Sequence, residues 1–290
     1  MSIKINYLKK KINGASSNVV LFSNDKFNIS GFKKFLSNSE YSYLNDLLKT
    51  SDLKKNLLVF EISSKKKIVL ISIKNNLKTS DIENLGAEFY NRINSGKNSQ
   101  YFILSDTVNS KNKNFLGHFL HGLKLKSYEF KKYKTKNENK IIDVSISGNK
   151  NVPSSKDILK FKSVEEGTFF ARNLVSEPGN VLHPDEYAKR LISLRKDGLK
   201  ITLYDENKLK KMGMHALLGV GQGSIRGSYL ATMEWSGVKN NSKPLAFVGK
   251  GVCFDTGGYS LKPAKFMEDM TYDMAGSAVV VGLMKNLALR

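Results

Sequence analysis

A glycine-rich, charged loop that follows a short apolar run constrains this 290-residue chain more than any other feature. Residues 245–248, Leu-Ala-Phe-Val, have the length and composition of a strand. Glycines follow at positions 249, 251, 257 and 258, and glycine lets a backbone take positive φ and approach a ligand because it has no Cβ. The charged residues of the loop and its continuation are Lys250, Asp255, Lys262 and Asp273. This pattern is typical of an active-site loop.

The charged residues of this loop suit a metal ion. Asp255 and Asp273 offer carboxylate oxygens, which bind hard or borderline divalent cations and stay ionised beside them. Lys250 could ligate only as a neutral amine, and a nearby dication can lower a lysine pKa far enough for that. The alternative is an ordinary solvated loop, in which the same residues face water.

Two strings of this region resemble a known family. Val-Gly-Lys-Gly-Val-Cys-Phe-Asp-Thr-Gly-Gly-Tyr-Ser-Leu-Lys-Pro at 248–263 and Met-Thr-Tyr-Asp-Met-Ala-Gly-Ser-Ala at 270–278 closely resemble the metal-binding segment of the leucyl (cytosol) aminopeptidases. Members of that family are two-metal exopeptidases that remove the N-terminal residue from peptides. A match of the whole string in order favours a metal site over the solvated loop.

The resemblance implies a role for each matching residue. Lys250, Asp255 and Asp273 would be metal ligands, with Asp255 bridging two ions. A charged Lys262 would bind substrate and stabilise the oxyanion of the tetrahedral intermediate, and Met270 would line the pocket for the substrate's first side chain. The implied reaction is hydrolysis of a leucine-like N-terminal residue by a water that two divalent ions, manganese or zinc, activate.

The resemblance is incomplete, because the family carries further metal ligands beyond the equivalent of Asp273. It also carries there an arginine that positions a bicarbonate acting as base. The matching stretch is not found before Arg290, so we expect this chain to be a fragment truncated within the catalytic domain, with uncertain activity by itself. An inactive pseudoenzyme on the same scaffold is an alternative. The full-length protein is expected to form a homo-hexamer and to act on peptides.

The remaining pattern predicts an α/β fold in two parts. We expect an N-terminal α/β domain with a mixed sheet at 1–147, a linker at 148–163, and an incomplete α/β aminopeptidase catalytic domain at 164–290. In the first part, strands are predicted at 18–22, 57–62, 67–73, 101–104 and 141–146, with helices at 82–93, capped by Ser80 and Asp81, and at 116–123. In the second, helices are predicted at 164–174, from 184, at 206–212 and at 276–289, with strands at 200–204, 228–235 and 244–249.

The excess of basic residues in the first half of the chain leaves nucleic-acid binding open as a second class of function. Residues 1–150 carry 27 Lys and Arg against 12 Asp and Glu, and the basic segment 128–139 is interleaved with aromatic residues. Such a surface could bind DNA, although an AT-rich genome also produces many lysines and asparagines, and a solvated loop is the favoured interpretation of the segment. A DNA-binding or regulatory protein on an aminopeptidase scaffold is therefore the runner-up.

Cysteine and apolar content predict a cytoplasmic location. The single cysteine, Cys253, excludes an internal disulfide; a small buried hydrophobe is the favoured role, with a thiolate ligand as the alternative. No run approaches the roughly 18 apolar residues of a membrane span, and the N-terminus lacks a signal-peptide core. His118 and His121 are interpreted as structural.

Overall fold

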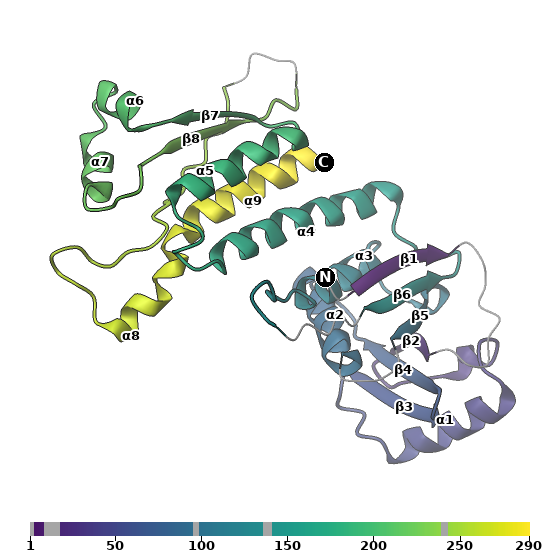
Figure 1. Cartoon of the computed structure of the whole chain (residues 1–290). Coiled ribbons are helices and arrows are strands. Elements are labelled where there is room, and N and C mark those ends of the chain that lie inside the picture. Colours follow the sequence, from purple (N-terminus) through teal and green to yellow (C-terminus); the bar gives the residue numbers. More distant parts are fainter. Residues whose placement is uncertain (1–2, 9–17, 95–98, 136–140, 239–242) are drawn as a thin grey trace. The chain divides into compact units, whose positions relative to one another are not determined.

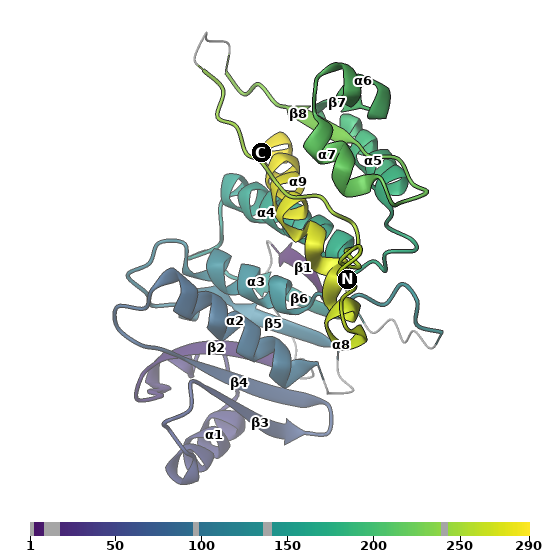
Figure 2. The ribbon, with the colours of Figure 1, turned by 90° about the vertical axis from the view of Figure 1, so that its left-hand side faces the viewer.

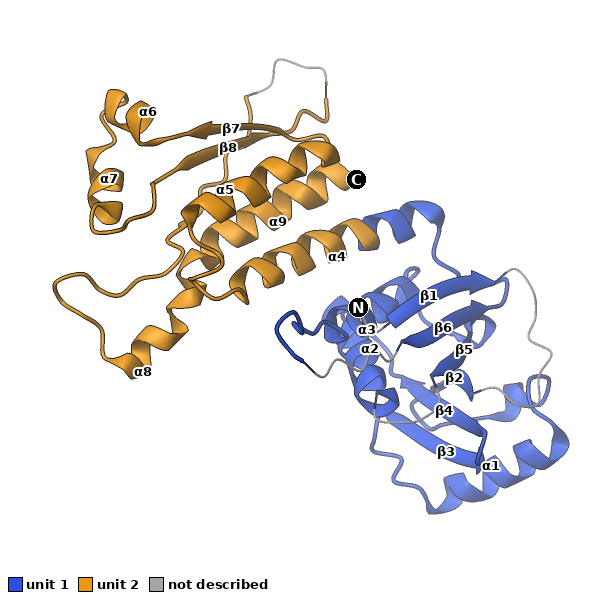
Figure 3. Cartoon of the chain, in the orientation of Figure 1, with its two compact units in different colours: residues 1–161 blue, residues 162–290 orange. Residues whose placement is uncertain are grey.

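The computed structural model describes residues 3–8, 18–94, 99–135, 141–238 and 243–290 (Figure 1). The chain divides into two compact units, residues 1–161 and 162–290 (Figure 3). Both units combine helices and strands, so the predicted α/β class is confirmed. Among the described residues, no helix has the length and apolar character needed to cross a membrane.

The first unit is built on one six-stranded sheet with strand order β1-β6-β5-β2-β4-β3. Its strands are β1 (Ile3–Leu8), β2 (Asn18–Asn24), β3 (Leu57–Ser63), β4 (Lys66–Ile73), β5 (Gln100–Leu104) and β6 (Ile142–Ser147). Only β3 runs antiparallel to its neighbour, and the other pairs are parallel. The sheet is therefore mixed, as the sequence predicts.

Helices cover both faces of this sheet. The helices of this part are α1 (Asn38–Thr50), α2 (Thr79–Ile93) and α3 (Phe115–Lys126). Successive residues of β2 point to opposite faces: Val20 and Phe22 pack with the apolar residues of α2 and α3, whereas Val19 and Leu21 pack in the cluster that includes Leu44 of α1. Figure 2 shows α2 and α3 side by side and α1 apart from them.

Two glycines allow α2 and α3 to pack closely. A Cβ on Gly86 would lie 1.9 Å from the carbonyl oxygen of Phe119, and a Cβ on Gly122 would lie 1.9 Å from that of Glu83. The neighbouring histidines have local partners. His118 Nδ1 lies 3.0 Å from Glu83 Oε1, and the rings of His118 and His121 lie 5.0 and 5.1 Å from that of Phe161.

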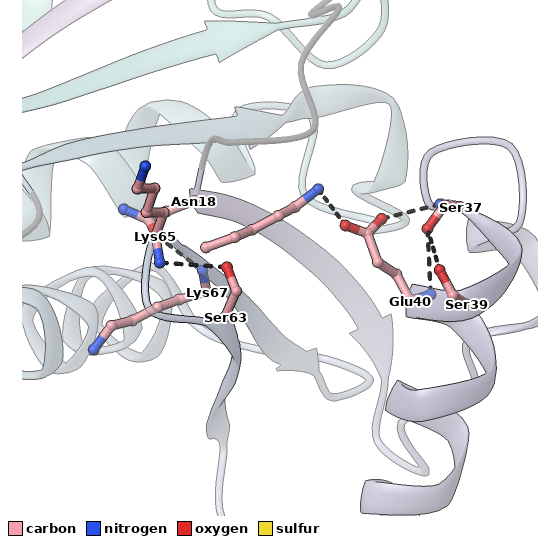
Figure 4. Close-up of polar contacts among 8 residues, drawn as sticks. Asn18, Ser37, Ser39, Glu40, Ser63, Lys65 and Lys67 are labelled. Carbon is pink, nitrogen blue, oxygen red and sulfur yellow. Dashed lines mark hydrogen bonds and ion pairs between the residues drawn. The ribbon is translucent and has the colours of Figure 1, made fainter.

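A buried ion pair joins the start of β4 to the start of α1. Lys66 Nζ lies 2.6 Å from Glu40 Oε1, and the two side chains are only 6% and 15% exposed. Glu40 also belongs to a capping box: its carboxylate accepts from the backbone N–H of Ser37, and the Ser37 hydroxyl accepts from the backbone N–H of Glu40 (Figure 4). One carboxylate therefore fixes both the helix end and the buried ammonium.

The second unit holds a two-stranded antiparallel sheet and several helices. Its elements are α4 (Ser155–Val175), which begins in the first unit, α5 (Pro184–Ser193), β7 (Lys200–Tyr204), α6 (Glu206–Lys211), α7 (His215–Gly221), β8 (Leu230–Glu234), α8 (Ala264–Met267) and α9 (Ala275–Leu289). Gly167 of α4 and Gly282 of α9 let these helices approach, since a Cβ on Gly167 would lie 2.3 Å from the Gly282 carbonyl oxygen. Tyr187 and Leu191 of α5 share a buried cluster with Ala278 and Val281 of α9.

Several local expectations differ from the structure. The predicted strand 244–249 is wrong: these residues belong to no strand, because no described strand lies beside them to accept or donate ladder hydrogen bonds. The cap of α2 is Lys78, whose N–H donates to Asp81 Oδ2 at 2.9 Å, and not Ser80. In the predicted linker 148–163, α4 already begins at Ser155, since the Ser154 hydroxyl accepts from the N–H of Asp157 at 3.1 Å.

Candidate metal centre

The loop between residues 244–249 and α8 is shaped by an aspartate and two glycines. Asp255 Oδ1 accepts a hydrogen bond of 2.8 Å from the N–H of Gly257, two residues further on. Gly257 and Gly258 have φ of +94° and +73°, which other residues rarely adopt. The backbone thus turns sharply directly after Asp255, and the turn fixes the direction of its carboxylate.

Lys262 returns to the other end of this turn. Its N–H donates to the carbonyl oxygen of Thr256 at 2.9 Å, and its Nζ lies 3.1 Å from Asp255 Oδ2. The Gly257 N–H and, after it, the Lys262 ammonium hold the pKa of Asp255 below its usual range. Asp255 is therefore an ionised carboxylate near neutral pH.

Lys250 and Asp273 form the second charged pair of the site. Lys250 Nζ lies 2.6 Å from Asp273 Oδ1, and this hydrogen bond raises the pKa of Lys250. Asp273 lies in the last turn of a short 3-10 helix, Glu268–Met274, so a residue 23 positions after Lys250 contacts the glycine loop. The side chain of Asp273 is only 15% exposed, whereas that of Lys250 is 60% exposed.

A buried oxygen of Asp273 that lacks a hydrogen-bond partner indicates whether these residues fit a metal ion. Asp273 Oδ2 is buried and has no hydrogen-bond partner. Buried carboxylate oxygens are almost always satisfied, and a cation is one of the few partners that satisfies such an atom without a donor hydrogen. The described residues hold no cluster of three or more His, Cys, Asp or Glu, so the donor set consists of two carboxylates and Lys250. This set fits a divalent ion held by few protein ligands.

Met270 lies next to the charged end of Lys262. Its Sδ is 3.1 Å from Lys262 Nζ, so the thioether is a weak acceptor for the ammonium. The structure therefore brings together Lys262, Asp255 and Met270 on one side, and Lys250 and Asp273 on the other. The interaction of Lys250 with Asp255 also contributes to raising the pKa of Lys250, which ties the two sides together.

Cys253 contacts its own loop and is buried. It is 7% exposed, its Sγ lies 3.8 Å from the carbonyl oxygen of Gly251, and burial raises its pKa to about 12. A protonated thiol in the apolar cluster of this unit matches the buried-hydrophobe interpretation.

Two residues near the site, Ser277 and Tyr187, are not predicted from the sequence. The N–H of Ser277 donates to the carbonyl oxygen of Lys250 at 2.9 Å, and the Ser277 hydroxyl lies 2.9 Å from that of Tyr187. Ser277 does lie inside the string 270–278, but a hydroxyl carries no charge pattern that marks it. Tyr187 belongs to α5, far earlier in the chain, and only the fold brings it here.

The fold and this loop define an α/β protein with a candidate metal centre on a glycine turn. Residues 169–290 match the model of the cytosol aminopeptidase family, catalytic domain. This part of the chain belongs to that family, as the resemblance of the loop predicts.

Curated relatives and solved structures extend the comparison. The chain is 42% identical over 219 residues to a probable cytosol aminopeptidase of Nitrobacter winogradskyi, covering 74% of this chain and 44% of that protein. It is 44% identical over 198 residues to one of Phytoplasma australiense, covering 67% and 40%. The matches thus span less than half the length of these relatives. A bottromycin maturation enzyme, BotP in complex with Mn, shares the fold with a TM-score of 0.72 at 19% identity, over 94% of this chain and 56% of that one.

Proposed function

We propose that this chain supplies the metal-binding loop of a metal-dependent aminopeptidase that removes leucine-like residues from peptide N-termini. The observation that carries the proposal is the buried, unsatisfied Asp273 Oδ2 beside Lys250. The family membership of residues 169–290 supports the peptidase class. Because the chain spans less than half of the relatives above, the activity proposed is that of the whole protein.

Three residues would hold the metal. Asp273 and Asp255 offer ionised oxygens, and Lys250 would join them as a neutral amine after it loses its proton and its bond to Asp273. Manganese and zinc both accept such ligands. When bound, a divalent ion would lower the pKa of a water and polarise a carbonyl oxygen.

Lys262 and Met270 would act on the substrate. The ammonium of Lys262 is held at the loop by Asp255 and by Met270 Sδ, each at 3.1 Å. A fixed positive charge at this place would stabilise the oxyanion that forms when the peptide carbonyl is attacked. Met270, as its immediate neighbour, would contact the first side chain of the substrate, since a flexible thioether adapts to apolar groups.

Hydrolysis of leucyl-p-nitroanilide by the whole protein, of which this chain supplies the loop, with added manganese or zinc tests this function. Lys262→Ala should lower kcat by about 100-fold or more, the usual effect of removing one oxyanion donor, and leave metal affinity largely unchanged. Lys265→Ala is the matched control, because Lys265 is a nearby exposed lysine on α8. Equal activity of the two variants would contradict the role of Lys262, and no hydrolysis by the unaltered whole protein with either metal would contradict the proposed function.

Partners and assembly stay predictions. A homo-hexamer and a bicarbonate beside the metal pair are expectations from the family resemblance. DNA binding by the basic first unit is the less favoured alternative, and part of the basic segment 128–139 lies outside the described residues.

A further inference from the structure

The first turn of α9 contacts the candidate metal loop through its backbone. The first N–H groups of a helix lack partners within the helix, and that of Ser277 donates instead to the carbonyl oxygen of Lys250 at 2.9 Å. The approach is close: a Cβ on Gly249 would lie 2.5 Å from Ser277 Cα. The position of Lys250 therefore depends on where Ser277 lies.

The hydroxyl of Ser277 extends this contact towards Asp273. Ser277 Oγ donates to the carbonyl oxygen of Met274, the residue next to Asp273, at 2.8 Å. Ser277 thus contacts the candidate ligand Lys250 through its N–H. Through its hydroxyl it contacts Met274, the neighbour of the candidate ligand Asp273. A shift of Ser277 would change the separation of Lys250 and Asp273.

Tyr187 of α5 fixes the same hydroxyl from the other side. Its hydroxyl lies 2.9 Å from Ser277 Oγ, and its side chain is 6% exposed within the apolar cluster of this unit. Because the single proton of Ser277 Oγ goes to Met274, Tyr187 must be the donor. Burial raises the pKa of Tyr187 to about 12, so the donating proton is present throughout the neutral range.

We propose that Tyr187 and Ser277 are positioning residues, a hydroxyl bridge from α5 to α9 that holds Lys250 and Asp273 at the spacing a divalent ion needs. The inference rests on the proposed metal site and adds to it two residues that touch neither metal nor substrate. Hydrogen bonds behind metal ligands commonly contribute 10- to 100-fold to affinity.

The test measures Mn²⁺ binding by calorimetry in the unaltered chain, Tyr187→Phe, Ser277→Ala and the double variant. Tyr187→Phe removes one oxygen only, and Mn²⁺ affinity should fall about 10-fold. Tyr229→Phe is the matched control, because it deletes another tyrosine hydroxyl of the unit, one that donates to Asp185 Oδ1 at 2.8 Å, and it should bind Mn²⁺ like the parent. The double variant should bind no more weakly than Ser277→Ala, since Tyr187 acts only through Ser277.

Amide hydrogen exchange adds a readout that needs no metal. In Tyr187→Phe, exchange at Ser277 and at residues 249–255 should accelerate, while the rest of the unit keeps the parent rates. Unchanged exchange there, or Mn²⁺ affinity equal to that of the parent, would overturn the bridge. If the unaltered chain bound no Mn²⁺, both the metal site and the positioning role would be contradicted, even if amide exchange changed in Tyr187→Phe. If the unaltered chain bound Mn²⁺ and Tyr187→Phe bound it equally well, only the positioning role would be contradicted. The two failures are therefore distinguishable.

Discussion

At the scale of single residues, Gly249 is a position of the loop that leaves no room for a side chain. A Cβ there would lie 2.5 Å from Ser277 Cα and 2.7 Å from the Gly276 carbonyl oxygen, and both are backbone atoms that cannot rotate away. The contact is the one that brings Lys250 next to the start of α9. Glycine is therefore required here by proximity, since Gly249 is not among the residues with positive φ.

Gly249→Ala is expected to destabilise the protein and disturb the metal loop. Forcing a methyl group into a packed contact typically costs about 1–3 kcal/mol of unfolding free energy, and Mn²⁺ affinity should fall with it. Denaturant unfolding and calorimetry measure the two effects. Gly223→Ala is the control, because nothing lies within 4 Å of a Cβ there. Equal stability of Gly249→Ala and the parent would show that α9 and the loop are not in close contact.

The charged residues of the site could be predicted from the sequence, whereas their supports could not. Lys250, Asp255, Lys262 and Asp273 are marked by charge among glycines, and the structure brings them together in two ion pairs. Tyr187 and Ser277 give no such signal, because their contribution depends on hydrogen-bond geometry between α5 and α9. Their identification needs the fold.

At the scale of elements, the Glu40–Lys66 pair links α1 to β4. Both side chains are largely buried, and Glu40 also satisfies the N–H of Ser37 at the helix end. Removing one partner of a buried pair leaves the other charge without compensation, which costs more than the pair gains.

Glu40→Gln is expected to destabilise the protein by about 3 kcal/mol, because it leaves the Lys66 ammonium buried and unpaired. Urea unfolding measures the change. The double variant Glu40→Gln with Lys66→Met should recover much of the loss, since it removes the buried charge as well. Glu61→Gln serves as the control, because its pair with Lys67 is exposed on the glutamate side. A loss no larger than that of the control would contradict the account.

The same pair predicts how stability changes with acid. Burial alone would raise the pKa of Glu40, but the hydrogen bond from Lys66 and that from the Ser37 N–H outweigh burial and lower it below the usual 4.5. A lowered pKa in the folded state means that the contribution is fully present above about pH 4.5 and is lost as the pH falls through the folded value. Unfolding free energies measured between pH 3 and 7 should show this loss in the parent and a smaller one in Glu40→Gln. Parallel pH profiles would contradict it.

Elements were predictable where their pattern is local. Five strands of the sheet stand out as short apolar runs, and α2, α3 and α9 follow helical spacing, whereas β1 (Ile3–Leu8) is not predicted from the sequence. Residues 244–249 have the composition of a strand, but a strand also requires a neighbour, and composition cannot supply one. The helix α1 was missed, because its apolar residues are few and its start depends on the side chains of Ser37 and Glu40.

At the scale of the whole molecule, the two units differ in how their apolar side chains are covered and in which of them matches the family. The first unit is a covered mixed sheet whose cores lie on both faces. The second carries the family match and the loop, and it exposes large apolar side chains such as Val248, Tyr259 and Leu261.

The measurement that tests the central claim most directly is calorimetric titration of the chain with Mn²⁺ beside Asp273→Asn. The account predicts saturable binding by the parent and a loss of at least about 10-fold in Asp273→Asn, because an amide replaces the ionised carboxylate whose Oδ2 lacks a partner. Glu234→Gln, which removes an exposed carboxylate paired with Lys200, should bind like the parent. Binding that is absent in the parent, or equal in Asp273→Asn, would contradict the metal site.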